Sequence, residues 1–330
     1  MKVLLLGATG LLGHNVLHRL LDEGYDVVAV VRRREGLYIP LADANIVEGS
    51  ILDATTLTRA AEGCDAIINC AGTTDMSLLH EEDYMPVNRD LPATLIDIMK
   101  HHGIKRLVHI SSVDTIGYGD AEHPADEHAA MRWPFTESYY ALSKRAGEEA
   151  ILKGLQDAPG LEAVILNPGY MLGAYDVRPS SGEMLRIAYR KSVMCCPRGG
   201  KAFVPVADVA DAAVRALTRG TSGSRYIVTH RGGHLTIKQL YALQADILGY
   251  RQLCFVVPAW IMLAIGALGD LLRSMGMRSA VSRRNIRQLL VREYYDNHHG
   301  LCDLGYVETS LADAIHDFHT WRQRDLYKQR

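Results

Sequence analysis

The feature of this chain that most constrains its fold is a short apolar strand that runs into three glycines near the N-terminus. Residues 3–6 are apolar, and glycine then recurs at every third position of Gly7-Ala8-Thr9-Gly10-Leu11-Leu12-Gly13. The segment from Leu11 to Glu23 has apolar residues at helical spacing and is closed by Gly24. The N–H groups and positive dipole end of such a helix point at whatever lies over the glycines. This arrangement predicts a dinucleotide site that holds a pyrophosphate, with a tight structural turn as the alternative.

The second apolar strand indicates which dinucleotide binds. It covers residues 26–31 and runs into Arg32-Arg33-Arg34. Sites that prefer NAD have an Asp or Glu at the end of this strand, about 20 residues beyond the glycines, whereas an arginine there suits the 2′-phosphate of NADP. Because Arg32 takes this position, we expect NADP(H) as the cofactor, with NAD as the alternative. A solvated basic loop is the other interpretation of this run of charge.

Length and composition limit the class of protein. A chain of 330 residues predicts one large domain or two unequal ones. The net charge of −2 gives no indication of a nucleic-acid partner. The six cysteines form no Cys-xx-Cys pair, and no signal peptide precedes the first strand, so we expect reduced thiols in a cytoplasmic protein. The histidines lack accompanying ligands at metal-site spacing, and we expect no metal.

Strands and helices alternate along the first half of the chain, which predicts an α/β fold. Such alternation produces a doubly wound parallel sheet with helices on both faces, the NAD(P)-binding Rossmann fold. The expected strands are residues 3–6, 26–31, 45–47, 66–69, 106–110 and 163–166, and the expected helices are 11–23, one from 54, 90–102 and 137–156.

Beyond residue 169 the pattern becomes irregular and rich in helix. A strand at 203–206 enters a helix that we expect Asp208 to cap, and 225–229 is one more strand. We therefore assign residues 1–169 and 203–230 to a dinucleotide-binding domain. Residues 170–202 and 231–330 then form a smaller, mostly helical substrate-binding subdomain.

One segment, Phe255 to Gly269, is almost entirely apolar. It is shorter than the ~20 residues that a spanning helix needs. Pro258 suits the first turn of a helix. We expect a buried or substrate-lining helix and no membrane partner, with interfacial contact by residues 255–269 as the alternative.

A tyrosine and a lysine four residues apart suggest acid–base chemistry. Tyr140 and Lys144 share one face of the expected helix, whereas Tyr139 is paired by spacing with Ser143 and points elsewhere. A phenol has a pKa near 10, and a nearby lysine cation brings that pKa toward neutral pH. In a helix without other signals the same spacing is usually incidental.

Two serines follow the strand at 106–110, where ligands bind in doubly wound sheets. A hydroxyl at Ser111 or Ser112 is placed to hold a substrate oxygen while Tyr140 gives or takes its proton. A serine cap or turn is the alternative, and for Ser111 it is the favoured one.

These motifs together resemble the extended short-chain dehydrogenase/reductase family over nearly the whole chain. The matching segments are the glycine motif, Asp53, Asn69-Cys70-Ala71-Gly72, Val87-Asn88, Ser111-Ser112, Tyr140-xxx-Lys144, Asn167-Pro168-Gly169 and Phe203-Val204-xx-Ala207-Asp208-Val209-Ala210. Within the family the chain is most similar to the branch with dihydroflavonol reductases, 3β-hydroxysteroid dehydrogenases and NAD-dependent epimerase/dehydratase-like proteins.

The resemblance implies a role for each matching residue. Ser112, Tyr140 and Lys144 are the implied catalytic serine, acid–base and partner lysine. The implied cofactor-binding residues are Gly7, Thr9, Gly10, Leu11, Leu12, Gly13, Arg32, Ser50, Ile51, Ala71, Gly72, Asn88, Tyr140, Lys144 and Pro168.

Two segments depart from the family pattern. Ser50-Ile51 replaces the usual Asp-Leu or Asp-Ile beside the adenine, which leaves the adenine-amine contact open. The segment 167–174 lacks the Arg-Pro-xx-xx-Tyr-Gly-Pro pattern of sugar-nucleotide epimerases.

We therefore expect an NADP(H)-dependent enzyme that reduces a carbonyl, or oxidises the matching alcohol, of a bulky hydrophobic small molecule. The apolar run at 255–268 favours such a substrate. The alternatives are a sugar-nucleotide epimerase or dehydratase, for which 170–197 offers Arg178, Arg186, Arg190 and Lys191, and a non-catalytic NADP-binding sensor or scaffold. The resemblance also implies a homodimer formed through the helices at 90–102 and 137–156.

Overall fold

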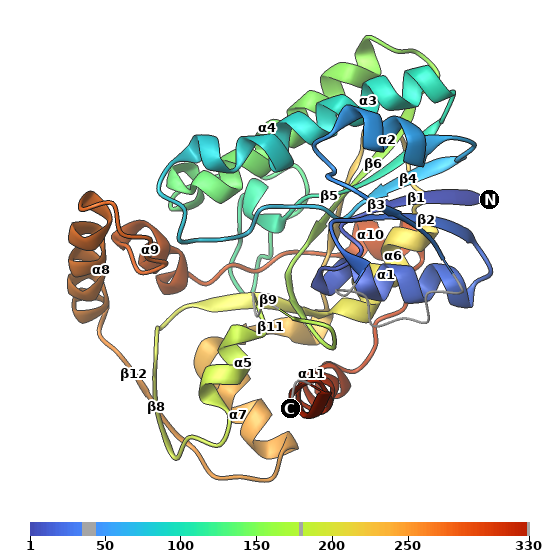
Figure 1. Ribbon diagram of the computed structural model, residues 1–330. Helices are drawn as coiled ribbons and strands as arrows, with labels where there is room; N and C mark the ends of the chain where they lie inside the picture. The colour runs from blue at the N-terminus through green and yellow to red at the C-terminus, as the bar shows by residue number, and fades with distance from the viewer. Residues whose placement is uncertain (35–43, 178–180, 329–330) are drawn as a thin grey trace.

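A seven-stranded, all-parallel sheet forms the centre of the molecule in the computed structural model (Figure 1), which describes residues 1–34, 44–177 and 181–328. The strand order is β10-β6-β5-β4-β1-β2-β3. The strands are β1 (Lys2–Leu6), β2 (Asp26–Val31), β3 (Asn45–Glu48), β4 (Ala66–Asn69), β5 (Arg106–Ile110), β6 (Glu162–Pro168) and β10 (Arg225–Val228). This is the doubly wound Rossmann order, in which the order of the strands reverses between β1 and β4.

Helices cover both faces of this sheet. One face is covered by α1 (Leu11–Asp22), α6 (Val206–Arg215) and α10 (His298–Leu304), and the other by α2 (Ala54–Ala61), α3 (Leu91–His102) and α4 (Tyr139–Gln156) (Figure 1). Along β1, Val3 and Leu5 belong to the first core, whereas Leu4 and Leu6 belong to the second. Both sides of each central strand are therefore buried, which accounts for the continuous apolar runs in the sequence. The predicted fold class is confirmed.

The remaining elements lie beside the large sheet, at the lower left in Figure 1. Three short strands, β7 (Tyr170–Leu172), β9 (Gly200–Pro205) and β11 (His234–Thr236), form one small sheet, and β8 (Val193–Cys196) pairs with β12 (Leu253–Val256). The helices here are α5 (Glu183–Ala188), α7 (Ile237–Ile247), α8 (Ala259–Ser274), α9 (Arg283–Leu290) and α11 (Leu311–Lys328). Strand β9 pairs with β7 and β11 in the small sheet, whereas α6, which follows it directly, packs on the large sheet. The chain thus passes between the two parts without a separate linker, and the domain boundaries at 203 and 230 stay a prediction.

The expected strand and helix around residue 206 are present, but Asp208 is not the cap. The helix α6 begins at Val206 with Pro205 as its N-cap, which places Asp208 inside the first turn. There its Oδ1 accepts hydrogen bonds from Thr309, 3.0 Å from the backbone N and 2.6 Å from Oγ1. Asp208 therefore ties α6 to the C-terminal segment instead of closing its own helix.

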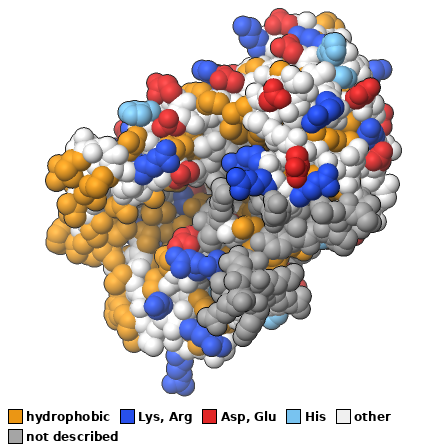
Figure 2. Space-filling view, viewed as in Figure 1, with side chains coloured by type: hydrophobic (Ala, Val, Ile, Leu, Met, Phe, Trp, Pro, Cys, Tyr) orange, Lys and Arg blue, Asp and Glu red, His pale blue; other side chains and the backbone are white. Residues whose placement is uncertain are grey.

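The helix expected to be buried, α8, lies largely exposed. Trp260 is 71% exposed and Leu268 is 61% exposed, and the buried residues of the helix are Gly266 and Gly269. In Figure 2 hydrophobic side chains accordingly gather on the outer surface at the left, over α8. The expectation of a buried helix is wrong, because helical spacing identifies an apolar stripe without specifying what covers it. None of the helices that the structure describes is long and apolar enough to cross a membrane.

Candidate active site

The glycine turn after β1 packs directly against the end of β4. Gly7 has a φ of +81°, and a Cβ there would lie 2.7 Å from the backbone N of Ala71. A Cβ on Gly13 would lie 2.0 Å from the carbonyl oxygen of Gly7. Side chains at these positions would force the strand, the turn and the helix apart, so the spacing of the motif is a packing requirement.

The N-terminus of α1 has the properties of a diphosphate site. Its N-cap is Gly10, which has no side chain to satisfy the first N–H groups of the helix. Gly10 is exposed, and Thr9 and Leu11 beside it are partly exposed. N–H groups at an accessible, uncapped helix start fit the diphosphate of a dinucleotide.

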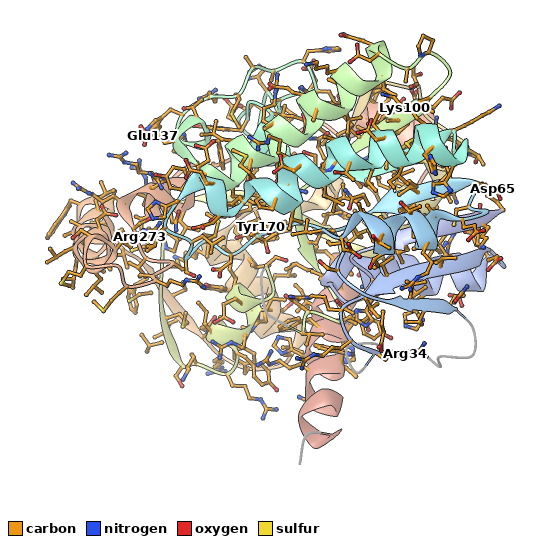
Figure 3. The ribbon with its side chains drawn as sticks, turned by 45° about the horizontal axis from the view of Figure 1, so that its top comes forward. Arg34, Asp65, Lys100, Glu137, Tyr170 and Arg273 are labelled. Carbon is orange, nitrogen blue, oxygen red and sulfur yellow. The ribbon has the colours of Figure 1, made fainter. Side chains whose placement is uncertain are left out.

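The residues predicted to surround the adenosine lie at the ends of β2 and β3, which are adjacent parallel strands. Arg32 directly follows β2 and is exposed, and Ser50 and Ile51 follow β3. Arg34, labelled in Figure 3, forms an ion pair with Glu48, with 3.3 Å between Nε and Oε1. The structure gives Arg32 no carboxylate partner among the residues it describes.

The loop after β4 is held by two asparagines. Asn69 Oδ1 accepts from Ala71 N at 3.1 Å. Asn88 Oδ1 accepts from Thr73 N at 2.8 Å, and its Nδ2 donates to Thr73 O at 3.0 Å and to Ser143 Oγ at 2.9 Å. Asn88 lies in a π-helical turn, Pro86–Asp90, that leads into α3. It thereby joins the loop that follows β4 to helix α4.

Lys144 extends from α4 under the end of β5. The side chain is buried, and its Nζ donates to the carbonyl oxygen of Ile110 at 2.7 Å. A Cβ on Gly72 would lie 3.3 Å from the same Nζ, so the lysine lies against the β4 loop. Burial lowers the pKa of Lys144 to about 8, and the nearby Glu148 carboxylate acts in the opposite direction.

Sequence reasoning did not include Glu148, which is fully buried one turn beyond Lys144. Its Oε1 accepts from Thr115 Oγ1 at 2.7 Å, from Asn167 Nδ2 at 2.8 Å and from Ser111 Oγ, and its Oε2 pairs with Arg225 at 2.9 Å. The i,i+4 spacing of Lys144 and Glu148 was the available signal. Ser111 therefore serves this buried network, which corrects its favoured interpretation as a cap or turn.

The side chains of Ser112 and Tyr140 lie close together, and the Ser112 hydroxyl acts to lower the pKa of the Tyr140 phenol. Ser112 Oγ also accepts from the backbone N of Asp114 at 3.2 Å, so this serine caps the turn that follows it. Tyr139 lies apart, with the Arg284 guanidinium 3.5 Å from the centre of its ring. The structure thus places Ser112, Tyr140 and Lys144 together at the C-terminal ends of the strands of the large sheet.

The pKa of Tyr140 is raised, contrary to the tuning expected from Lys144. Burial is the main cause, the Asp114 carboxylate adds to it, and the hydrogen bond with Ser112 opposes both. Lys144 directs its ammonium to the Ile110 carbonyl instead. Tyr140 is therefore a protonated phenol at neutral pH.

A second set of buried charges surrounds Asp114, whose carboxylate acts on Tyr140. Lys201 is paired with Glu293 and donates to Gln288 O at 3.2 Å, and its Nζ lies 5.6 Å from the centre of the Tyr170 ring, labelled in Figure 3. Burial raises the pKa of Glu293 to about 8 and raises that of Asp114. Both carboxyls share the single Lys201 cation, which disfavours the ionisation of both at once.

No local motif indicates this cluster of charges, because its members lie on segments far apart in the sequence.

Pro168 ends β6 next to β10, at the same C-terminal end of the strands as Ser112. In the described ranges no group of three His, Cys, Asp or Glu side chains is arranged to hold a metal ion.

Comparison with known proteins identifies the family. Residues 3–229 match the model of the NAD dependent epimerase/dehydratase family. Sterol demethylase protein B of Methylococcus capsulatus is 29% identical over 99% of this chain and 100% of its own. A 4-hydroxy-2-methyl-3-oxo-4-farnesyl-3,4-dihydroquinoline-1-oxide ketoreductase of Stigmatella aurantiaca is 25% identical over 82% of this chain and 80% of its own.

Among solved structures, the UDP-glucose 4-epimerase of Thermus thermophilus in complex with NAD has the same fold, with a TM-score of 0.76, 20% identity and coverage of 97% of this chain and 98% of that one. The family match spans more than half of the sequence and includes the glycine turn, the Tyr140–Lys144 pair and the strand ends around them. The chain therefore belongs to the NAD-dependent epimerase/dehydratase family, within the extended short-chain dehydrogenases/reductases.

Proposed function

We propose that the protein is an NADP(H)-dependent oxidoreductase that reduces a carbonyl of a bulky hydrophobic compound, or oxidises the matching secondary alcohol. The observation that carries the proposal is the placement of the Ser112 and Tyr140 side chains next to each other, with Lys144 buried beneath the same ends of the strands. A protein that only bound a nucleotide would have no need of all three groups, and this argues against the sensor alternative.

The chain supplies a place for each part of the cofactor. The uncapped turn at Gly10 suits the diphosphate, and Arg32 suits a 2′-phosphate on the adenosine ribose. Lys144 lies next to Gly72, where it would hold the nicotinamide ribose. NAD stays the alternative, since the related T. thermophilus epimerase was solved with NAD.

The side chains at the sheet edge have separate tasks. When bound, the nicotinamide supplies or accepts a hydride. Ser112 holds the substrate oxygen by a hydrogen bond, and Tyr140 gives its proton to that oxygen. The phenol of Tyr140 is protonated at neutral pH, as the reductive direction requires, and its raised pKa makes it a weaker acid than a free phenol.

A hydrophobic substrate is favoured by two observations. The cations that a second diphosphate would need are partly engaged: Arg186 pairs with Glu183, and Arg190 lies over the ring of Tyr189. Arg178 lies outside the described residues. The names of the two relatives, a sterol demethylase protein and a ketoreductase of a farnesylated quinoline oxide, also describe large apolar molecules.

A thermal-shift screen in the presence of NADP⁺ tests the substrate class. The panel would pair UDP- and GDP-sugars with steroid, flavonoid and simple aryl ketones. We expect a selective rise in melting temperature with an apolar ketone, followed by its NADPH-dependent reduction measured as loss of NADPH absorbance. A selective shift with a nucleotide sugar, with epimerisation and no net change in NADPH, would instead establish the sugar-nucleotide alternative.

A further inference from the structure

Helix α8 is oriented with its small residues inward and its large apolar residues outward. Gly266 and Gly269 are buried against the segment that starts α9, where added Cβ atoms would lie 2.9 Å from Arg283 Cα and 2.0 Å from Val281 O. Trp260, Leu268 and Leu271 on the same helix are each more than half exposed. A helix that only covered the protein core would have the opposite arrangement.

The exposed face continues onto neighbouring elements. Eleven of the 17 exposed large apolar residues in the described chain belong to β8, β12, α8 and the turn up to residue 281. Phe255 on β12 is 58% exposed and Met275 at the end of α8 is 60% exposed. Figure 2 shows these elements as one hydrophobic area at the left and lower left. We call it the apolar face. A continuous area of this kind marks an interaction site.

The charge around the apolar face is strongly positive. Residues 251–292 hold seven arginines and one aspartate, a net charge of +6 in a chain whose total is −2, and Glu137 from outside this range pairs with Arg287 at 2.7 Å. The aspartate, Asp270, already pairs with Arg283 at 2.7 Å. Arg251 and Arg278 are exposed beside the apolar residues. An anionic partner with an apolar interior is complementary to this combination.

The region is also anchored firmly to the edge of the candidate site. Arg273 donates to the carbonyl oxygens of Ser77 at 3.3 Å and Leu78 at 2.5 Å, in the loop that follows β4 (Figure 3 labels Arg273). Asn285 Nδ2 donates to Met76 O at 2.9 Å. These contacts tie α8 and α9 to the loop that follows β4.

We propose that the apolar face docks on the surface of an anionic lipid bilayer, with Trp260, Leu268 and Leu271 inserted at the level of the headgroups. Trp is suited to this depth, because its ring is apolar and its N–H is polar. The exposed Arg251 and Arg278 beside it would bind lipid phosphates. A second copy of the chain is a poorer occupant, because a twofold contact through this face would bring two sets of positive charge together.

Sedimentation with vesicles tests the proposal. The full chain is mixed with phosphatidylcholine vesicles with and without phosphatidylglycerol, at low and high salt. We expect binding to the anionic vesicles that weakens with salt. The double variant Trp260→Glu/Leu268→Glu should lower the partition coefficient by about tenfold or more, since two large apolar side chains no longer insert. The matched control is Val307→Glu, an equally exposed apolar residue outside the face, which should bind like the wild type.

A second measurement needs no charged variant. Brominated phosphatidylcholine in the anionic vesicles should quench the tryptophan fluorescence of the wild type, and Trp260→Phe should remove most of that quenching. The proposal fails if the wild type binds neither vesicle, or if the double variant binds as well as Val307→Glu. It also fails if light scattering shows a dimer that Trp260→Glu/Leu268→Glu converts to a monomer.

Discussion

At the scale of single residues, the hydroxyl of Tyr140 is the group on which the proposed chemistry depends. Tyr140→Phe keeps the ring and removes the proton that Ser112 helps to position. We expect turnover on a verified substrate to fall by about 10²–10⁴-fold, the contribution of a positioned acid. The dissociation constant for NADP⁺ should change little. Tyr139→Phe is the matched control, because Tyr139 lies under Arg284 and away from Ser112. Retention of most activity by Tyr140→Phe would contradict the assignment.

The charge of Arg32 should decide the choice of cofactor. Dissociation constants for NADP⁺ and NAD⁺ are measured by fluorescence titration in the wild type and in Arg32→Asp. We expect the wild type to prefer NADP⁺, and the variant to lose about tenfold or more of its affinity for it, as for one charge-assisted hydrogen bond. Arg33→Asp changes the same net charge one residue away and serves as the control. Equal affinities for both cofactors in the wild type would rule out this role of Arg32.

Residues whose signal is local could be predicted, and those that act across the chain could not. The glycine turn and the Tyr140–Lys144 pair each lie within a few residues, so spacing alone placed them on the right elements. Lys201, Glu293 and Asp114 come from three distant segments, and only the tertiary fold brings these charges together and places Asp114 near Tyr140. The raised pKa of Tyr140 follows mainly from its burial and then from the Asp114 carboxylate, neither of which the sequence shows, and therefore the sequence predicted the opposite shift.

At the scale of elements, the contact between α6 and the C-terminal segment should depend on pH. Burial raises the pKa of Asp208 to about 6, above its ordinary value of 3.8. Between these two values the folded state binds more protons than the unfolded chain. The contribution of Asp208 to stability is therefore complete below about pH 4 and is lost as the pH rises through about 6.

Asp208→Asn removes that dependence. Asparagine keeps an oxygen for Thr309 and puts an amide where Oδ2 has no hydrogen-bond partner among the described residues. At about pH 8 we expect the variant to be more stable than the wild type by on the order of 1–2 kcal/mol, and the gain to vanish near pH 4. Urea unfolding at both pH values measures this, with the exposed Asp157→Asn as control. A difference that does not change with pH would contradict the prediction.

The buried parallel strands were the easiest elements to predict. Seven of the expected strands agree with the structure to within about two residues, because a strand covered on both faces is apolar throughout. The orientation of α8 was not predictable in the same way. Its composition required a helix, but only the packing of Gly266 and Gly269 against the start of α9 determines that the large side chains face outward.

At the scale of the whole molecule, the homodimer through α3 and α4 stays a prediction. No large apolar residue of these two helices is exposed in the described structure, so the interface would be polar. Polar interfaces without an apolar centre are typically weak. We expect the molar mass from light scattering to rise from monomer to dimer with concentration in the micromolar range. A constant monomer mass across that range would exclude this assembly.

The outer half of the molecule shows where prediction from sequence ends. Its two small sheets are built from strands of three to six residues, and β11 joins β9 across some thirty residues of sequence. Such short strands have no periodicity of their own, and distant partners determine their pairing. The shape of the predicted substrate-binding part therefore depends on contacts between distant segments, which are seen only in the folded chain.

The π-helical turn at Pro86–Asp90 makes the candidate site sensitive to chain length as well as to residue type. A π-helix accommodates one more residue per turn than an α-helix, and here that wider turn directs Asn88 toward both Thr73 and Ser143. Deleting a single residue from the turn would let α3 extend backward as regular helix and rotate Asn88 by about 100°. Substitution scans preserve length and would miss this requirement. We therefore expect insertions and deletions in this turn to displace Asn88 more than substitutions that preserve the length of the turn.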